Sequence, residues 1–423
     1  MNEKIIDIGY KDIFAQKEYM KSILAGIINR FGDAIDSIAF VWLIYQVTQS
    51  AAWSAIIFGT NRIPTIFLQP FAGAIVEGKN KKYILVVMDL IRGVCVGFIA
   101  TALIMGFLNQ WILLIMTLII SSAEAFRKPA SNALIPRLLD KKYYEFGLSL
   151  NTSACSAVEL IGLGAAGFII AATSISVAIY IDMATFFISA VLVLTINIEE
   201  EDSRKEKSPI KNGESDFKEG LTYIKREPLL RYYAFFGVFL NGILVPFNSL
   251  QAPIISQVLN ANEVMLSVLG MSLTIGMIIG ASIYPHISKK LNDQDIIGIG
   301  GYSIGVFYFS FILVGKYIHS KIAPYVIIAI VSFVVGITIS LANSACNIKV
   351  LKSVEEKYLA RVSALMGAVC MAAIPIVSLI ISAFVKILST SVIIILSGVL
   401  SIIISFSLCN KKGFSNFIED KEE

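Results

Sequence analysis

Residues 73–107, GAIVEGKNKKYILVVMDLIRGVCVGFIATALIMGF, contain the pattern that decides the fold. Residues 77–82 form a polar break with Glu77 and three lysines, and the following residues 83–107 are largely apolar, with Asp89 and Arg92 as the charged exceptions. A bilayer hydrocarbon core about 30 Å thick needs about 20 apolar residues in a helix. The stretch therefore predicts a membrane-spanning helix that begins directly after a basic loop.

The same alternation recurs along the whole chain, which has 423 residues, 56% of them apolar and only 16% charged. Average soluble domains are about 45–50% apolar and about 25% charged, so an ordinary soluble protein is excluded. The pattern predicts an all-α integral membrane protein with twelve spans. They cover residues 22–46, 52–76, 83–107, 111–134, 146–170, 174–196, 230–256, 264–287, 296–315, 323–347, 360–385 and 388–409.

A charged stretch from Glu199 to Glu227 divides these spans into two sets of six. The sequence thus predicts an N-terminal six-helix bundle (1–198), a cytoplasmic linker (199–227) and a C-terminal six-helix bundle with a cytoplasmic tail (228–423). Within the linker, Phe217 to Arg226 has helical spacing and is expected to lie on the membrane surface. Gly73 with its following lysines recurs about 207 residues later as Gly280 with Lys289 and Lys290, which suggests that the halves are repeats.

Lysine and arginine placement orients the chain, because cytoplasmic loops carry the excess of basic residues. If both termini are inside, only Lys316, Lys321 and Lys386 fall outside. We therefore expect a multi-pass protein of the plasma membrane with both termini and the linker in the cytoplasm. The net charge is only +4, so no nucleic-acid partner is expected.

Charges inside the predicted spans need partners or functions, since each costs about 2.5–3.5 kcal/mol on insertion scales. Three pairs in the inner half are spaced i, i+3 and are expected to neutralise each other along one helix face. The pairs are Arg30 with Asp33, Asp89 with Arg92, and Glu124 with Arg127.

A second group lies near the predicted mid-membrane level and consists of Asp36, Arg62, Glu159 and Asp182. Three carboxylates face one arginine, so we expect one or two of them to bind protons or a cationic substrate. Glu159 is the first choice, because its own helix has no cation at i±3 or i±4, whereas Asp36 has Arg62 on the neighbouring helix. The alternative is structural: Asp182 caps a kink, and Glu159 bonds a neighbouring helix. In that case the coupling site is expected at Asp33, Asp36 or Glu124, with Arg127 in the same group of candidate residues.

The sequence contains no motif that indicates an enzyme active site or a cofactor site. Residues 73–79 fit the first seven positions of a phosphate-binding loop, but Asn80 stands where a Ser or Thr must hold magnesium. Neither histidine has a nucleophile nearby, and the five cysteines lie singly, without zinc-ligand spacing. We expect no enzyme activity, no cofactor and no metal.

The loop Gly73-x-x-x-Glu77-Gly78-Lys79-Asn80-Lys81-Lys82 resembles the signature between spans 2 and 3 of the major facilitator superfamily, with Glu in place of the usual Asp. Gly73 would permit close helix approach, and the lysines would compensate the negative end of span 2. The resemblance implies a gate at the inner ends of the bundles. Its expected residues are Gly73, Glu77, Lys81, Lys82, Asp89 and Arg92.

Further stretches resemble the drug- and siderophore-exporting branch that includes macrolide efflux proteins. They are Asn29-Arg30-Phe31-Gly32-Asp33, the run Pro129 to Pro136, Ile181-Asp182 with Thr185-Phe186-Phe187, and Phe217-Lys-Glu-Gly220. Span 5 departs from the branch, since Gly162-Leu163-Gly164 lacks the proline of the antiporter signature. The resemblance implies a monomeric bacterial carrier that exports a small amphiphilic compound in exchange for protons. The alternatives are an importer or lipid carrier of the same fold, or a non-transporting sensor.

Overall fold

The computed structural model describes residues 10–77, 79–197, 222, 224, 226–354 and 356–409. Most of the predicted linker and both chain ends lie outside these ranges, as do the side chains of Glu77 and several residues near the start of the eleventh span. The predicted surface helix from Phe217 to Arg226 also falls almost wholly outside the described residues.

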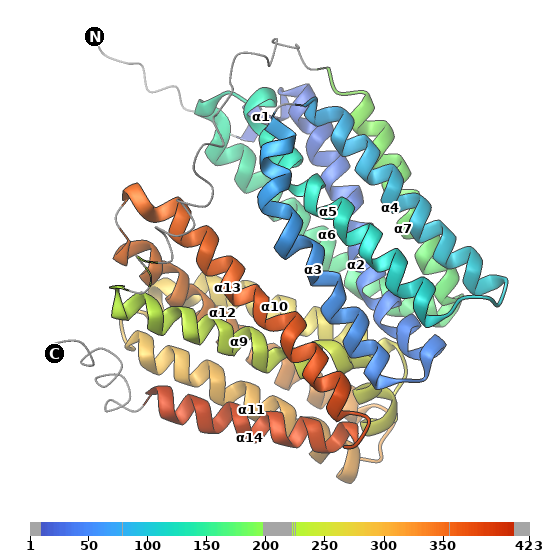
Figure 1. Cartoon of the computed structure of the whole chain (residues 1–423), viewed down its shortest axis with the longest axis vertical. Coiled ribbons are helices and arrows are strands. Elements are labelled where there is room, and N and C mark those ends of the chain that lie inside the picture. Colours follow the sequence, from blue (N-terminus) through green and yellow to red (C-terminus); the bar gives the residue numbers. More distant parts are fainter. Residues whose placement is uncertain are drawn as a thin grey trace. The chain divides into compact units, whose positions relative to one another are not determined.

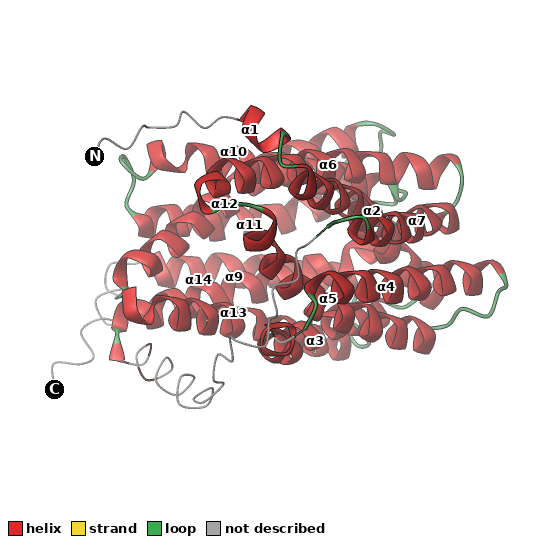
Figure 2. Cartoon of the chain, turned by 90° about the horizontal axis from the view of Figure 1, so that it is seen from above, coloured by secondary structure: helices red, strands yellow, loops and turns green. Residues whose placement is uncertain are grey.

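The described part of the chain contains twelve helices of 20 residues or more, and within each half of the chain the described loops between them are short (Figures 1 and 2). Each predicted span falls on one of these helices, so the prediction of twelve membrane helices is confirmed. Some of them, such as Lys17–Thr48, Gln110–Leu138 and Ala323–Ser353, extend beyond the predicted apolar spans. In the first half the long helices are α2 (Lys17–Thr48), α3 (Ala51–Glu77), α4 (Lys81–Ile104), α5 (Gln110–Leu138), α6 (Tyr144–Ala172) and α7 (Ile175–Leu194), preceded by the short α1 (Tyr10–Phe14), with the 3-10 turn η1 (Lys141–Tyr143) before α6.

The second half contains α9 (Pro228–Pro253), α10 (Val264–Ile287), α11 (Asp293–Tyr317), α12 (Ala323–Ser353), α13 (Glu356–Phe384) and α14 (Thr390–Cys409). A π-helical turn, η2 (Ile254–Val258), continues α9. Ten of the twelve long helices are apolar enough to cross a membrane by length and composition. The other two are α2 and α3, and in α2 the charges of Arg30, Asp33 and Asp36 lower the mean hydropathy.

Contacts between residues divide the chain into two units. The first is Met1–Leu43 with Ile63–Ser208, and the second is Ile44–Arg62 with Pro209–Glu423. Helices α2 and α3 are therefore shared, because their connected ends, residues 44–62, group with the second unit. Inside the first unit α4 packs along α7 and α5, and inside the second α10 packs along α12.

Small residues permit these close contacts. A Cβ built on Gly280 of α10 lies only 2.5 Å from the carbonyl oxygen of Ile337 on α12, and one built on Gly162 of α6 lies 2.7 Å from Ala34 Cβ on α2. Gly73 is different, because a Cβ built there meets no atom of the described residues within 4 Å. The close approach that we predicted at Gly73 is therefore not seen among the described residues, whereas the related Gly280 packs closely.

Candidate functional site

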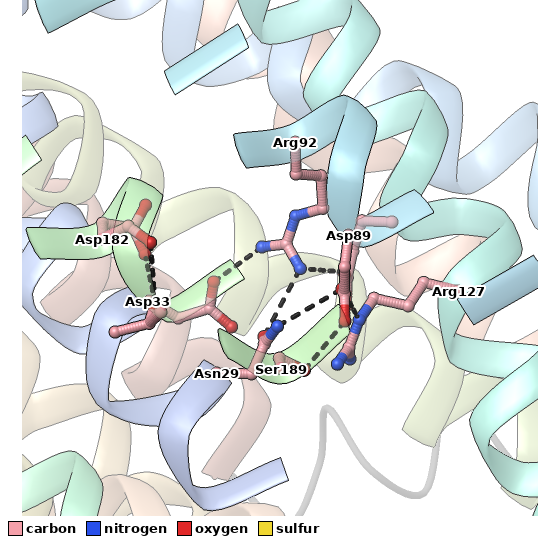
Figure 3. A network of polar contacts seen from close by, with 9 residues as sticks. Asn29, Asp33, Asp89, Arg92, Arg127, Asp182 and Ser189 are labelled. Carbon is pink, nitrogen blue, oxygen red and sulfur yellow. Dashed lines mark hydrogen bonds and ion pairs between the residues drawn. The ribbon is translucent and has the colours of Figure 1, made fainter. Parts of the chain in front are cut away.

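The charged residues of the first unit meet between helices, and Arg92 of α4 lies at the centre (Figure 3). Its Nη2 is 2.6 Å from Asp33 Oδ1 of α2, and its Nη1 is 2.9 Å from Glu124 Oε2 of α5. The Arg92 side chain is only 7% exposed, whereas Asp33 and Glu124 are 29% and 40% exposed. The guanidinium also lies 4.1 Å from the centre of the Phe186 ring. One buried cation therefore serves two carboxylates that solvent can reach.

Asp89 of α4 forms a second centre. Arg127 Nε lies 2.5 Å from Asp89 Oδ1, and Ser189 Oγ of α7 donates to Asp89 Oδ2 at 2.8 Å. The Asp89 side chain has no exposed surface. This carboxylate is therefore held by partners from two other helices, which fits a structural role.

Asn29 of α2 joins the two centres (Figure 3). In one orientation its amide donates to Asp89 Oδ1 at 3.3 Å and accepts from Arg92 Nη1 at 3.5 Å. In the flipped orientation it donates to Asp33 Oδ2 at 3.1 Å and accepts from Arg127 Nη2 at 3.1 Å. Either orientation lets the amide bridge one carboxylate and one guanidinium, and the flipped one has the shorter bonds.

Glu159 of α6 pairs with Arg30 of α2. Arg30 Nη2 and Nε lie 2.6 and 3.1 Å from Glu159 Oε2. The cation comes from a neighbouring helix and not from α6 itself, which agrees with the structural alternative in which Glu159 bonds a neighbouring helix.

The predicted i, i+3 pairs do not form either. Arg30, Arg92 and Arg127 each bind carboxylates of other helices, although each has a carboxylate three residues away on its own helix. Both members of such a pair point from one helix face toward the neighbouring helices. A partner on another helix can then meet the guanidinium in line, whereas a partner on the same helix requires both side chains to bend back.

Asp182 of α7 is buried and accepts a 3.4 Å hydrogen bond from Thr185 Oγ1. Gly32 of α2 faces this pair so closely that a Cβ would overlap both Thr185 Oγ1 and Asp182 Oδ1. Asp36 also belongs to the first unit, whereas Arg62 belongs to the second. The Cζ atom of Arg62 lies 6.0 Å from the centre of the Phe58 ring.

The ion pairs of Arg30, Arg92 and Arg127 join three guanidiniums to four carboxylates, which leaves one negative charge in excess. A cavity of about 210 Å³ borders this network and is lined by α2, α5 and α6. Its wall includes Asp33, Glu124, Arg30 and Arg127, and also the Tyr19 hydroxyl, which is buried without a partner among the described residues. The arrangement can accept a proton or an organic cation at its accessible carboxylates.

The structure describes only some of the residues expected at the gate. Asp89 and Arg92 belong to the charge network, and the side chain of Glu77 lies outside the described residues. Lys82 Nζ donates to the carbonyl of Ile196 at 2.7 Å, so it compensates the end of α7 and not the end of span 2 as predicted. Lys81 is buried.

Sequence reasoning missed Asn29, Thr185 and Ser189. In α7 the residues Asp182, Thr185 and Ser189 follow at i, i+3 and i+7, which places them on one helix face. That polar stripe in an otherwise apolar helix was the available signal. Asn29 was not assigned a role, because charged residues were considered and Asn29 is a neutral residue next to Arg30.

Twelve long helices, most of them of membrane-spanning character, and a charge network buried between them define a polytopic membrane protein. Residues 22–378 match the Major Facilitator Superfamily. The chain therefore belongs to that superfamily, whose members are transporters and not enzymes.

Several curated relatives are similar at low identity. An uncharacterized MFS-type transporter of Bacillus subtilis, YkuC, is 25% identical over 70% of this chain and 71% of its own length. Macrolide efflux protein A of Streptococcus pyogenes is 22% identical over 89% of this chain and 92% of its own. The multidrug efflux pump Tap of Mycolicibacterium fortuitum is 22% identical over 84% and 86%.

Solved structures share the fold. The nucleoside transporter NupG superposes with a TM-score of 0.73 at 11% identity, covering 92% of this chain and 98% of its own. A bacterial homologue of the human lysosomal transporter Spinster gives a TM-score of 0.67 at 12% identity, covering 96% and 98%. These similarities establish the architecture.

Proposed function

We propose that this protein is a secondary active transporter that exports an amphiphilic organic compound in exchange for protons by alternating access. The proposal rests on one observation above all: Arg92 is shared by Asp33 and Glu124, and both carboxylates line the cavity. The names of the macrolide and multidrug efflux relatives support export of such compounds.

Shared coordination provides a coupling mechanism. One guanidinium cannot fully compensate two carboxylates, so the group carries an excess negative charge beside the cavity, within the membrane-spanning helices. A proton on Asp33 or Glu124 removes that excess, and a cationic group of a substrate in the cavity removes it as well. Since both compete for the same charge, binding of one favours release of the other, which is the requirement for exchange.

Asp33 and Glu124 replace Glu159 as the proposed coupling groups. Glu159 is compensated by Arg30, so neutralising it leaves a guanidinium without its partner. Asp36, Asp182 and Arg127 are proposed to set the local field, and Asp89 to hold Arg127. Gating by Glu77 with the inner lysines remains part of the proposal.

The test uses purified protein in liposomes with an imposed pH gradient of either sign, a panel of lipophilic compounds that includes a macrolide, and a pH-sensitive dye. We expect wild type to accumulate substrate only when protons move in the opposite direction. Glu124→Gln and Asp33→Asn should lose gradient-driven accumulation and keep substrate exchange, because each mimics the protonated state.

Glu145→Gln is the matched control, because Glu145 is an exposed carboxylate at the start of α6, away from the network. It should transport like wild type. Accumulation by both network variants at the wild-type proton stoichiometry would show that these carboxylates are structural. Accumulation by wild type without proton movement would refute proton coupling itself.

A further inference from the structure

Helix α9 is opened by a side chain from another helix. The Tyr308 hydroxyl of α11 donates to the carbonyl of Ile243 at 2.6 Å, and the Phe247 N–H donates to the Tyr308 hydroxyl oxygen at 3.1 Å. In an unbroken α-helix the Phe247 N–H would bond the Ile243 carbonyl directly. The hydroxyl is thus inserted into the backbone ladder, which is one of the few causes of a sharp helix kink.

The neighbouring backbone is irregular as well. Pro246 has no N–H to offer the Gly242 carbonyl and its ring crowds that carbonyl. Leu250 has non-helical torsions (φ −112°, ψ 17°), and residues 254–258 form the π-helical turn η2. The regular part of α9 therefore ends at Leu250, three residues beyond Phe247, and the segment from Leu250 to Val258 follows the kink.

The residues at this break are closely packed against α11. Tyr308 has no exposed surface, and the Phe247 ring lies 4.8 Å from the Phe307 ring and 5.9 Å from the Phe311 ring. Because the hydroxyl replaces a backbone bond inside an apolar aromatic cluster, its loss would leave two buried polar groups without partners unless the helix closes.

The segment beyond the break is bonded to two other helices through the Gln257 side chain, and we call these two hydrogen bonds the clasp. Gln257 Nε2 donates to the Tyr45 hydroxyl at 2.7 Å, and Gln257 Oε1 accepts from Thr390 Oγ1 of α14 at 2.7 Å. Tyr45 lies near the end of α2, in the segment 44–62 that groups with the second unit. One amide thus ties this end of α2 to α14.

We propose that Tyr308 is a positioning residue for transport: by holding α9 open between Ile243 and Phe247, it aims the segment Leu250–Val258 so that Gln257 clasps Tyr45. The inference rests on the alternating-access function proposed above. Since α2 and α3 are divided between the two units, movement of one unit against the other must bend these helices or release residues 44–62. The clasp is the bond that such a release breaks.

Cysteine labelling tests this without substrate. Ser54 is buried in the segment 44–62, and Ser54→Cys provides a reporter of nearly the same shape. It is placed in a parent whose five native cysteines are replaced by alanine. The purified protein in nanodiscs is treated with a polar maleimide, and the labelling rate reports how often the segment is released.

Gln257→Leu should raise the labelling rate about fivefold, the equilibrium factor that corresponds to one hydrogen bond of about 1 kcal/mol. Tyr308→Phe should raise it by a similar factor, because closure of α9 moves Gln257 away from Tyr45. The double variant should label no faster than either single variant, since both changes release the same segment. A merely structural tyrosine would lower the melting temperature and leave this pattern absent.

Tyr317→Phe is the matched control, because Tyr317 is an exposed tyrosine on the same helix, and it should label like the parent. If Tyr308→Phe does not fold, Pro246→Ala restores an N–H at the same break and should also raise the rate. Parental labelling in a folded Tyr308→Phe protein, or in Pro246→Ala, would overturn the proposal. The readout needs neither substrate nor a proton gradient, so failure of proton-coupled export would leave these results unaffected.

Discussion

Arg92 is the residue on which most of the charge network depends. It contacts two carboxylates and the face of Phe186, and these contacts join α2, α4, α5 and α7. A guanidinium can do this because its nitrogens bond in several directions within one plane, whereas an ammonium group acts as a single point of charge.

Arg92→Met should therefore destabilise the protein strongly. Breaking a buried ion pair costs about 3–5 kcal/mol, and the partial exposure of Asp33 and Glu124 places this site near the lower value. Arg92→Lys should recover only part of the loss. Thermal unfolding in detergent measures both, with Arg137→Met as an exposed control. A melting temperature of Arg92→Met equal to that of the control would contradict the central position of Arg92.

Gly32 and Gly73 provide a second comparison at this scale. A methyl group at Gly32 would overlap Thr185 and Asp182, whereas one at Gly73 meets no described atom within 4 Å. Gly32→Ala should cost about 1–3 kcal/mol, as overpacking does, and Gly73→Ala should stay within about 0.5 kcal/mol. Thermal unfolding and expression level measure the loss of stability in both variants. Equal effects at the two glycines would mean that α2 and α7 do not approach as closely as the structure shows.

At the scale of elements, the end of α7 is held by two other helices. Lys21 Nζ of α2 donates to the Thr195 carbonyl at 2.9 Å, and Lys82 Nζ of α4 donates to the Ile196 carbonyl at 2.7 Å. Glu18 Oε2 accepts from the Asn197 N–H at 2.6 Å. The unpaired carbonyls at a helix C-terminus carry partial negative charge, so two lysines there satisfy hydrogen bonds and the helix dipole together.

Lys82→Met should weaken this attachment by about 1 kcal/mol, the usual net contribution of one such hydrogen bond. Lys79→Met is the natural control, since Lys79 is an exposed lysine of the same loop. Hydrogen exchange of the last turn of α7 should be faster in Lys82→Met and unchanged in Lys79→Met. The same exchange rate in both variants would contradict the attachment of Lys82 to the end of α7.

The same attachment should depend on pH. Hydrogen bonds from Lys21 and from the Asn197 N–H lower the pKa of Glu18 below its ordinary value. Because the folded-state pKa is the lower one, the contribution to stability is fully present above the unfolded-state value of about 4.3 and is lost as the pH falls through the folded-state pKa. Glu18→Gln should thus melt below wild type at neutral pH. The melting temperatures of the two proteins should become equal in acid. A difference that stays constant down to acid pH would show that the lowered pKa of Glu18 is not its cause.

For the whole molecule, the basic segments predict one orientation. A cysteine in place of Asn212, in the linker, should be labelled by an impermeant maleimide only after intact cells are opened. A cysteine in place of Lys386 should be labelled from outside in intact cells. Labelling of position 212 in intact cells would reverse the topology, and the inner and outer ends of every helix with it.

Hydrophobicity along the chain determines much of this protein by itself. An apolar run of about 20 residues has one stable form in a bilayer, because the backbone must satisfy its own hydrogen bonds there. That constraint is local, so ten of the twelve spans follow from length and composition, and α2 and α3 follow from the recurring pattern of apolar runs and polar breaks. The residue types needed at the site are visible for the same reason, since Arg92, Asp33 and Glu124 stand out as charges in apolar surroundings.

Only the tertiary structure decided which charges are partners. Spacing along one helix predicted pairs within α2, α4 and α5, and it left Glu159 without a cation. In the folded chain Arg92 reaches Asp33 and Glu124 on two other helices, and Arg30 reaches Glu159. The insertion of Tyr308 into α9 is equally invisible in sequence, because it joins residues 61 and 65 positions apart. Helical periodicity determines the face on which a side chain lies, whereas its partner depends on which helix packs against that face and at what depth.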